Sequence, residues 1–416
     1  MTERSTPRKA RIIPIVPQGR TAAQSVSGLE FRHALPLSLY VHIPWCVQKC
    51  PYCDFNSHEA RGEIPEAEYI SALIADLESA LPLIWGRKVS SIFFGGGTPS
   101  LLSGEGLDRL LIAVRTLLPL LPDAEVTLEA NPGTVESAKF AAFRAAGINR
   151  LSLGIQSFNP AHLKALGRIH DGDEARRAIE IAATHFDNFN LDLMYGLPGQ
   201  TLEEALSDVD TALSFAPTHL SCYQLTLEPN TAFAARPPEL PETDVCADMQ
   251  EAIEDKLAAA GFTHYETSAF AQPGRQCQHN LNYWTFGDYL GIGAGAHGKL
   301  TLHDGKQWEV RRQMRWKQPK QYLTQIAQAT AIQEEFAVEA ADLPFEFMMN
   351  ALRLNQGFQP DLFEMRTSLP LIAIENELRN AEQQGLIERQ PLRIIPTLQG
   401  QRFLNRLIEI FIAERD

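Results

Sequence analysis

The sequence has no apolar run long enough to cross a membrane. A helical span needs about 20 mainly apolar residues, and the nearest approach, residues 110–121, is interrupted by Arg115 and Pro119. A secretory signal is also missing, because the longest apolar stretch near the N-terminus, residues 12–16, contains Pro14. We therefore expect a protein that works in the cytoplasm.

Positive charge is scarce as well. Lys and Arg number 37 against 51 Asp and Glu, which gives a net charge of −14. Such a balance argues against a phosphate backbone or an anionic membrane as the main partner, so no nucleic-acid partner is expected. Residues 1–37 are basic and contain several prolines, and we predict a disordered head there. A targeting peptide is less favoured, because the prolines would break its amphipathic helix.

Cysteine is rare, and its distribution excludes a disulfide framework. Three of the six cysteines are scattered, whereas Cys46, Cys50 and Cys53 share one short segment. Thiolates at these spacings can surround one inorganic centre, and soft sulfur ligands select zinc, copper(I) or iron–sulfur clusters. A zinc site with His58 as fourth ligand is the alternative. The cluster is favoured because the segment follows the first strand of a βα series, where α/β enzymes place their reacting groups.

Strand-like segments alternate with helical patterns over residues 38–229, which indicates a parallel sheet because each crossover needs a helix. Six βα units are too few for a closed barrel of eight strands. The sequence therefore predicts an α/β fold, a partial (β/α)6 barrel, with a doubly wound sheet as the alternative. The strands are expected at residues 39–43, 89–94, 125–128, 150–153, 188–194 and 219–225. The helix after the third strand is expected to have Thr134 as its N-cap and to stop at Gly147.

The pattern changes after residue 229, which predicts a C-terminal α+β region in two parts. Residues 230–330 contain a helical pattern at 244–260, a strand pattern at 263–267 and a stretch rich in glycine and aromatic residues at 280–298. Residues 331–416 read as a small helical, winged-helix-like domain that ends in a helix at 399–413.

Polar and glycine residues at the strand ends are the next candidates for a site. Gly95-Gly96-Gly97-Thr98 follows a strand and lets a ligand approach the backbone closely, and no lysine follows, so it is not a nucleotide P-loop. Polar side chains at the ends of βα strands more often serve a site than a core, although each alone could be a satisfied loop residue. Those here are Glu129, Gln156, Arg168 and Asp192.

The Cys-x3-Cys-x2-Cys segment is similar to the cluster loop of the radical S-adenosylmethionine (SAM) family. That resemblance implies a [4Fe-4S] cluster on Cys46, Cys50 and Cys53, with SAM bound to the remaining iron and cleaved to a 5′-deoxyadenosyl radical. By the same resemblance the SAM site is lined by Tyr40, Tyr52, Gly96, Gly97, Thr98, Glu129, Gln156, Arg168 and Asp192.

Within this family the chain resembles oxygen-independent coproporphyrinogen III oxidases and, more closely, heme chaperones of the HemW type. Residues 279–284 match the His-Asn-x-x-Tyr-Trp motif of those chaperones, which makes His279, Tyr283 and Trp284 candidates for heme contact. A buried structural role for His279 is the alternative. Other residues considered for iron are Cys277, His42, His170 and His297, with His42 expected to support the cysteine loop instead.

Two functions follow from the resemblance. A chaperone would bind heme and pass it to client hemoproteins, including membrane respiratory enzymes, and would form homodimers through its cluster. An oxidase would decarboxylate coproporphyrinogen III with the radical. The oxidases carry a further cysteine two residues beyond the third cluster cysteine, where this chain has Asp54 and Phe55, so the chaperone is favoured. A zinc-stabilised barrel without redox function comes last.

Overall fold

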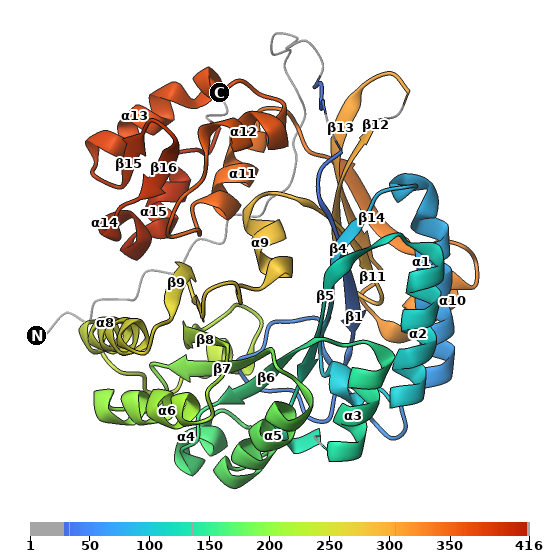
Figure 1. Ribbon diagram of the computed structural model, residues 1–416, viewed down its shortest axis with the longest axis vertical. Coiled ribbons are helices and arrows are strands. Elements are labelled where there is room, and N and C mark those ends of the chain that lie inside the picture. Colours follow the sequence, from blue (N-terminus) through green and yellow to red (C-terminus); the bar gives the residue numbers. More distant parts are fainter. Residues whose placement is uncertain (1–28, 33, 135, 304, 414–416) are drawn as a thin grey trace, which may run out of the picture.

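The computed structural model describes residues 29–32, 34–134, 136–303 and 305–413. Its centre is one sheet of 12 strands in the order β14-β13-β12-β11-β1-β4-β5-β6-β7-β8-β10-β9 (Figure 1). The six central strands are β1 Leu37–Ile43, β4 Val89–Gly96, β5 Leu120–Ala130, β6 Arg150–Gln156, β7 Phe189–Tyr195 and β8 His219–Gln224.

These six strands are parallel and follow chain order across the sheet, which confirms the predicted partial barrel. A doubly wound sheet would reverse its strand order near the middle, and this one does not. Helices lie outside the curve of the sheet (Figure 1). The helices that follow the strands are α1 Glu66–Ile84, α2 Gly104–Leu117, α3 Ser137–Ala146, α4 Pro160–Ala165, α5 Gly172–His185 and α6 Leu202–Ser214.

Two helices differ from the sequence interpretation. Helix α5 was not predicted, although a capping box of Asp171 and Glu174 marks its start. Helix α3 was expected to begin after Thr134, but its N-cap residue is Glu136. Thr134 instead ends a 3-10 turn, Pro132–Thr134, and its hydroxyl donates to the carbonyl of Asn131 at 2.9 Å. A Thr with a local carbonyl partner is no longer free to cap a helix.

The segment after the barrel adds strands to both edges of the same sheet. On one edge β11 pairs in parallel with β1, and β12, β13 and β14 follow antiparallel. On the other edge β10 and β9 follow β8. The sheet therefore continues past residue 330, where the sequence interpretation ended one unit. The added elements are α7 Ala232–Ala235, α8 Thr243–Ala259, β9 Thr263–Glu266, β10 Ala269–Ala271, α9 Gln278–Trp284, β11 Asp288–Ile292, β12 His297–His303, β13 Trp308–Arg315, α10 Pro319–Ile326 and β14 Ile332–Ala337.

The C-terminal residues contribute most of a second hydrophobic core, which Phe286 and Val310 also join. The tail predicted as one helix is two short helices that meet at Phe403. Phe31 and Leu35, from the predicted disordered head, are buried in this core, while residues 1–28 and 33 lie outside the described part. The elements are α11 Leu343–Ala351, α12 Pro360–Thr367, α13 Glu375–Gln383, β15 Ile387–Gln390, β16 Arg393–Pro396, α14 Leu398–Arg402 and α15 Leu404–Glu409.

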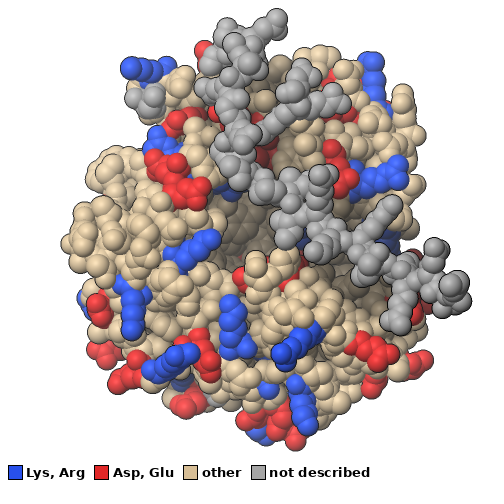
Figure 2. Space-filling view, turned by 180° about the vertical axis from the view of Figure 1, so that it is seen from behind, with Lys and Arg blue, Asp and Glu red and all other residues tan. Residues whose placement is uncertain are grey.

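Two surface properties complete the description. Acidic and basic side chains are interspersed on the face shown in Figure 2. Among the described residues, none of the helices combines the length and the apolar character that crossing a membrane would require.

Candidate functional site

The three clustered cysteines lie on one loop beyond the carboxyl end of β1. Strand β2, Trp45–Cys46, opens the loop and pairs with β3, His58–Glu59, which closes it. Between them the amide of Cys53 donates to the carbonyl of Cys50 at 3.2 Å. All three cysteines are half-buried and none is in a disulfide. The fold therefore presents three thiols from a single closed loop at the edge of the barrel mouth.

Polar groups of the barrel are directed at these sulfurs. Thr98 hydrogen-bonds with Cys46, the Ser57 hydroxyl lies 3.8 Å from Cys53 Sγ, and Arg168 Nη1 lies 3.6 Å from Cys50 Sγ. Burial raises the pKa of Cys46 and Cys53. Hydrogen-bond donors around half-buried thiolates are the environment that an iron–sulfur cluster requires, so these residues fit the implied group.

The zinc alternative places His58 beside the cysteines as a fourth ligand. In the structure the Nε2 atom of His58 is buried and has no hydrogen-bond partner among the described residues. Over the described ranges, no three His, Cys, Asp or Glu side chains are grouped so as to hold one metal ion. The structure therefore does not bring His58 and the three cysteines together as a site for one zinc ion.

The glycine turn after β4 packs against the start of the cysteine loop. The amides of Gly97 and Thr98 donate to the carbonyls of Ile43 and Trp45, each at 2.7 Å. A Cβ on Gly97 would lie 2.5 Å from the Trp45 oxygen, and Gly96 has φ +110°. Glycine is needed here because the turn touches the loop backbone and adopts a left-handed conformation. The amide of Gly97 is therefore already bonded and is not available to a ligand.

Two strand-end carboxylates, Glu129 on β5 and Asp192 on β7, are half-buried and interact electrostatically. Asp192 accepts hydrogen bonds from Asn190 at 2.7 Å and Ser152 at 3.0 Å. Burial raises the pKa of Asp192. Burial, together with the charge of Asp192, raises the pKa of Glu129 to about 8. The two carboxyl groups therefore favour a ligand whose hydroxyl groups donate hydrogen bonds or that carries positive charge.

Arg168 connects the cysteine loop to the strand ends. Its Nη2 donates to the carbonyl of Gly154 at 2.7 Å, and its Nη1 lies 3.5 Å from the Tyr52 hydroxyl. Its Nε is buried and has no hydrogen-bond partner, although a buried donor of this kind normally has one. Gln156, which ends β6 at φ 69°, accepts from the Tyr223 hydroxyl at 2.6 Å. The unpartnered donor suits an anionic ligand group such as a carboxylate.

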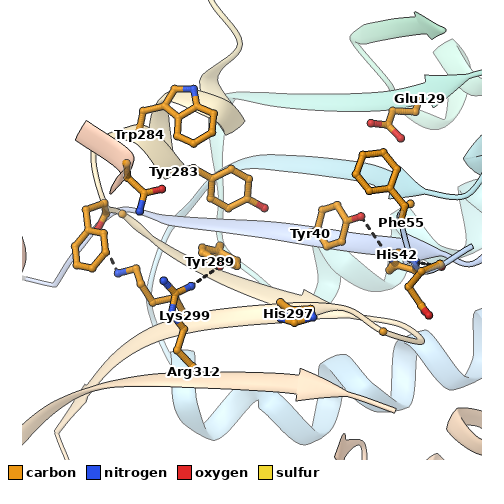
Figure 3. Close-up of a pocket in the computed structure, with 16 residues that line it drawn as sticks. Tyr40, His42, Phe55, Glu129, Tyr283, Trp284, Tyr289, His297, Lys299 and Arg312 are labelled. Carbon is orange, nitrogen blue, oxygen red and sulfur yellow. Dashed lines mark hydrogen bonds between the residues drawn. The ribbon is translucent and has the colours of Figure 1, made fainter. Parts of the chain in front are cut away.

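A cavity of about 470 Å³ opens beside this cluster (Figure 3). Tyr40, Gly96 and Glu129 line one wall, so the predicted SAM side and the cavity share residues. Tyr283 and Trp284, from the predicted heme motif on α9, lie at the other end. The remaining lining residues are His42, Phe55, Asn56, Phe286, Gly287, Tyr289, Gly295, His297, Lys299, Arg312 and Asn350.

His279, the leading heme candidate, does not line this cavity. Its side chain is 1% exposed, and both ring nitrogens have partners: Nδ1 with Ser91 at 3.0 Å and Nε2 with Tyr283 at 2.9 Å. Its ring also stacks on Phe93 at 5.0 Å. Burial lowers the pKa of His279 to about 3. The side chain has the contacts of a structural histidine, and iron ligation by it, still a prediction, would break one of these bonds.

The other iron candidates differ in whether their side chains already have hydrogen-bond partners and in whether they lie in the cavity. His42 supports the cysteine loop as expected, because its Nε2 bonds to the Asn56 carbonyl at 2.9 Å. His170 bonds to Asn131 and to the Ile155 carbonyl through its two nitrogens. Cys277 is buried and donates to Glu125 at 3.4 Å. His297 alone of the four is exposed and within the cavity.

Sequence reasoning missed several lining residues, namely Tyr289, Lys299, Arg312 and Asn350. The first three lie on β11, β12 and β13, strands that extend the barrel sheet. Lys299 is held by Asp288 at 3.0 Å, and Arg312 donates to the Tyr289 hydroxyl at 2.7 Å. The one signal in the sequence that could have indicated these lining residues was a charged side chain in a strand pattern. Lys299, next to Leu300, is the example.

Comparison with known proteins gives a consistent result. The radical SAM superfamily model matches residues 40–212, and the HemN C-terminal domain model matches residues 338–403. The chain is 50% identical over 380 residues, 91% of its length and 99% of the relative's, to a protein of Escherichia coli named heme chaperone HemW. The protein of that name from Haemophilus influenzae is 50% identical over 91% of this chain and 98% of its own.

Among solved structures, the coproporphyrinogen III oxidase HemN of Escherichia coli, described as a radical SAM enzyme, superimposes with a TM-score of 0.76. It is 26% identical, over 91% of this chain and 90% of the oxidase. The partial barrel, the three-cysteine loop and the near-complete match to curated relatives agree. The chain belongs to the radical SAM superfamily and, within it, to the family of heme chaperones called HemW.

Proposed function

We propose that this protein binds heme and delivers it to client hemoproteins, and that it carries a [4Fe-4S] cluster with SAM beside it. The observation that carries the proposal is the aromatic cavity, which shares a wall with the cysteine loop and strand ends. Aromatic rings at one end of the cavity are suited to pack on a porphyrin face. The printed names of the most similar relatives support the same function.

The strand-end residues suit SAM by their chemistry. Glu129 and Asp192 can accept hydrogen bonds from ribose hydroxyls, and the unpartnered Nε of Arg168 can donate to the methionine carboxylate. Tyr40 and Tyr52 border the same region from β1 and the cysteine loop. When bound, the reduced cluster supplies the electron that cleaves the sulfonium bond of SAM. The protein's own groups position the ligand and exclude water from it.

Three finer parts of the proposal rest on the family resemblance. The clients would include respiratory enzymes of the membrane, and the cluster would favour homodimers. The cytoplasm is the expected compartment. Because heme is the cargo, the protein must bind it tightly enough to carry it and weakly enough to release it to a client.

The alternative is a coproporphyrinogen III oxidase, favoured by the structural match to HemN over 91% of the chain. Against it stands the residue that replaces the extra cysteine. Phe55 is 62% exposed and lines the cavity beside the cysteine loop. A phenyl ring at this position has neither the proton nor the nucleophile that a thiol offers.

The test uses the full chain with its cluster reconstituted anaerobically and verified by absorbance and iron content. One sample receives coproporphyrinogen III, SAM and a reductant, and another receives ferric heme. We expect no protoporphyrinogen in the first and saturable heme binding in the second. Steady formation of protoporphyrinogen would assign the oxidase function instead. Failure to bind heme, with the cluster intact, would contradict the chaperone proposal.

A further inference from the structure

Of the two histidines among the described residues that line the cavity, His297 is the one whose ring is free to ligate iron. His297 begins β12 and projects into the cavity near Tyr40 and between the aromatic end and the cysteine-loop end (Figure 3). Among the described residues it is an exposed histidine whose ring has no hydrogen-bond partner. An imidazole with both nitrogens free can donate a lone pair to a metal without breaking an existing contact.

The other donors of the cavity are already engaged. His42 bonds through both ring nitrogens, to the Tyr40 hydroxyl at 3.0 Å and to the Asn56 carbonyl at 2.9 Å. The Tyr283 hydroxyl bonds with His279, and the Tyr289 hydroxyl accepts from Arg312. No cysteine lines the cavity within the described chain. Coordination by any of these groups would cost an internal hydrogen bond.

The backbone that carries His297 is firmly held, so its side chain is well placed. The preceding turn, Gly293–Ala296, contains left-handed glycines at 293 and 295. The amide of Gly293 donates to Asp76 at 3.1 Å, and the amide of Ala294 donates to the Tyr69 hydroxyl at 2.8 Å. Asp76 also accepts from Arg315 at 3.1 Å. A ligand on a rigid turn positions a metal more reproducibly than one on a loose loop.

The electrostatics keep the ring neutral. Burial, then the charges of Lys317 and Arg312, lower the pKa of His297, and only Glu334 opposes them. A neutral imidazole is the form that binds iron. The flat, aromatic lining beside it, Tyr283, Trp284 and Phe286, suits the faces and edges of a macrocycle.

We propose that His297 is the axial ligand of the iron of heme held in this cavity. The inference rests on the proposed heme-binding function and deepens it, since it transfers the ligand role from α9 to β12. The aromatic residues of the His-Asn-x-x-Tyr-Trp motif then contact the porphyrin, while His279 holds Tyr283 in position through its hydrogen bond.

The test is resonance Raman spectroscopy of ferrous heme bound to the full chain, with affinity measured by titration of ferric heme. Variants are His297→Ala, His279→Ala and, as a matched control, His303→Ala at the far end of the same strand and outside this cavity. Iron content and SAM binding are checked for each variant, so that misfolded protein is recognised.

We expect an iron–imidazole band in the wild type, the His303 variant and the His279 variant, and its loss in His297→Ala. Added imidazole should restore the band in His297→Ala, and heme affinity there should fall by about tenfold or more, or about 1.4 kcal/mol. An unchanged band and affinity in His297→Ala would overturn the assignment while leaving heme binding intact. Absence of heme binding in the wild type would instead overturn the proposed function.

Discussion

The two halves of the candidate site differ in the side chains that line them. At the strand ends, Asp192 accepts a hydrogen bond from Asn190 of its own strand, Gln156 accepts one from Tyr223, and Arg168 donates one to the Gly154 carbonyl. In the adjoining cavity several aromatic rings line the wall, and the ring of His297 has no hydrogen-bond partner among the described residues. A site that must orient a small polar cofactor needs fixed donors and acceptors, whereas a site that takes up and releases a flat cargo needs apolar surface and few fixed bonds.

This difference predicts that mutations can weaken SAM or cluster binding and heme binding independently of each other. Changes among the fixed polar groups should affect the cluster or SAM and leave heme binding nearly unaltered. Changes in the aromatic cavity should affect heme alone. Tyr40 and Glu129 line the cavity and also belong to the predicted SAM site, so changes to them can affect both ligands.

The largest effect is expected from the cysteines. Replacing Cys46, Cys50 and Cys53 together by serine should abolish the cluster, since hydroxyl groups are poor ligands for it. Iron content and the visible absorbance of the reconstituted protein measure this. Cys246→Ser is the matched control, because that thiol is buried away from the loop on α8. A triple variant that keeps its iron would show that the ligands lie elsewhere.

Arg168 should have the next largest effect. Arg168→Ala removes the unpartnered donor and the bond to Gly154. A hydrogen bond to a charged group is worth about 1.5–3 kcal/mol, so SAM affinity should fall roughly ten- to 100-fold. Calorimetric titration measures it, with Arg177→Ala on the exposed surface of α5 as control. Equal SAM affinities in the two variants would remove Arg168 from the site.

Glu129 should make SAM binding depend on pH. Its pKa is raised to about 8, so without ligand its neutral form dominates below that value. The contribution of the Glu129 carboxyl to folding stability is therefore fully present below about pH 4.5. It is lost as the pH rises through about 8. SAM is a cation whose ribose hydroxyls donate hydrogen bonds, so it binds more strongly to the ionised form of Glu129.

We therefore expect SAM affinity to rise between pH 6.5 and pH 9, by at most about tenfold per pH unit. Calorimetric titration at the two pH values measures the slope. Glu129→Gln should flatten it, because the amide does not ionise in this range. A slope that persists in Glu129→Gln would place the titrating group elsewhere.

The smallest effect is expected from the aromatic end. Trp284→Leu removes one ring from the cavity, and an aromatic contact is worth about 0.5–1.5 kcal/mol, so heme affinity should fall about two- to twelvefold with SAM affinity unchanged. Trp85→Leu is the control, since Trp85 is 80% exposed at the end of α1. If both variants bind heme equally well, the ring does not contact the porphyrin.

Sequence patterns predicted the barrel because its strands are short, apolar and regularly separated by helices. The six central strands appear close to their expected positions, and His42 supports the cysteine loop as predicted. Helix ends were less predictable, because local hydrogen bonds decide them. Thr134 is the example, since a bond to a neighbouring carbonyl occupies its hydroxyl.

The cavity could not be predicted because it depends on contacts between distant segments. Lys299 and Arg312 come from strands that join the sheet beside β1, and Asn350 comes from α11 of the C-terminal core. The sequence motif on α9 predicted heme contacts, but it did not show which of its side chains face the cavity. The structure shows His279 turned toward Ser91 in the core, whereas Tyr283 and Trp284 line the cavity.

The most direct test of the account is the transfer of heme from the cluster-loaded protein to a respiratory cytochrome stripped of its heme. The heme-loaded protein and the apo-cytochrome are mixed at several cytochrome concentrations, and the holo-cytochrome spectrum is followed with time. Delivery predicts a rate that rises with cytochrome concentration and exceeds the spontaneous loss of heme measured with a passive acceptor. A rate equal to that spontaneous loss at every concentration would contradict the chaperone function.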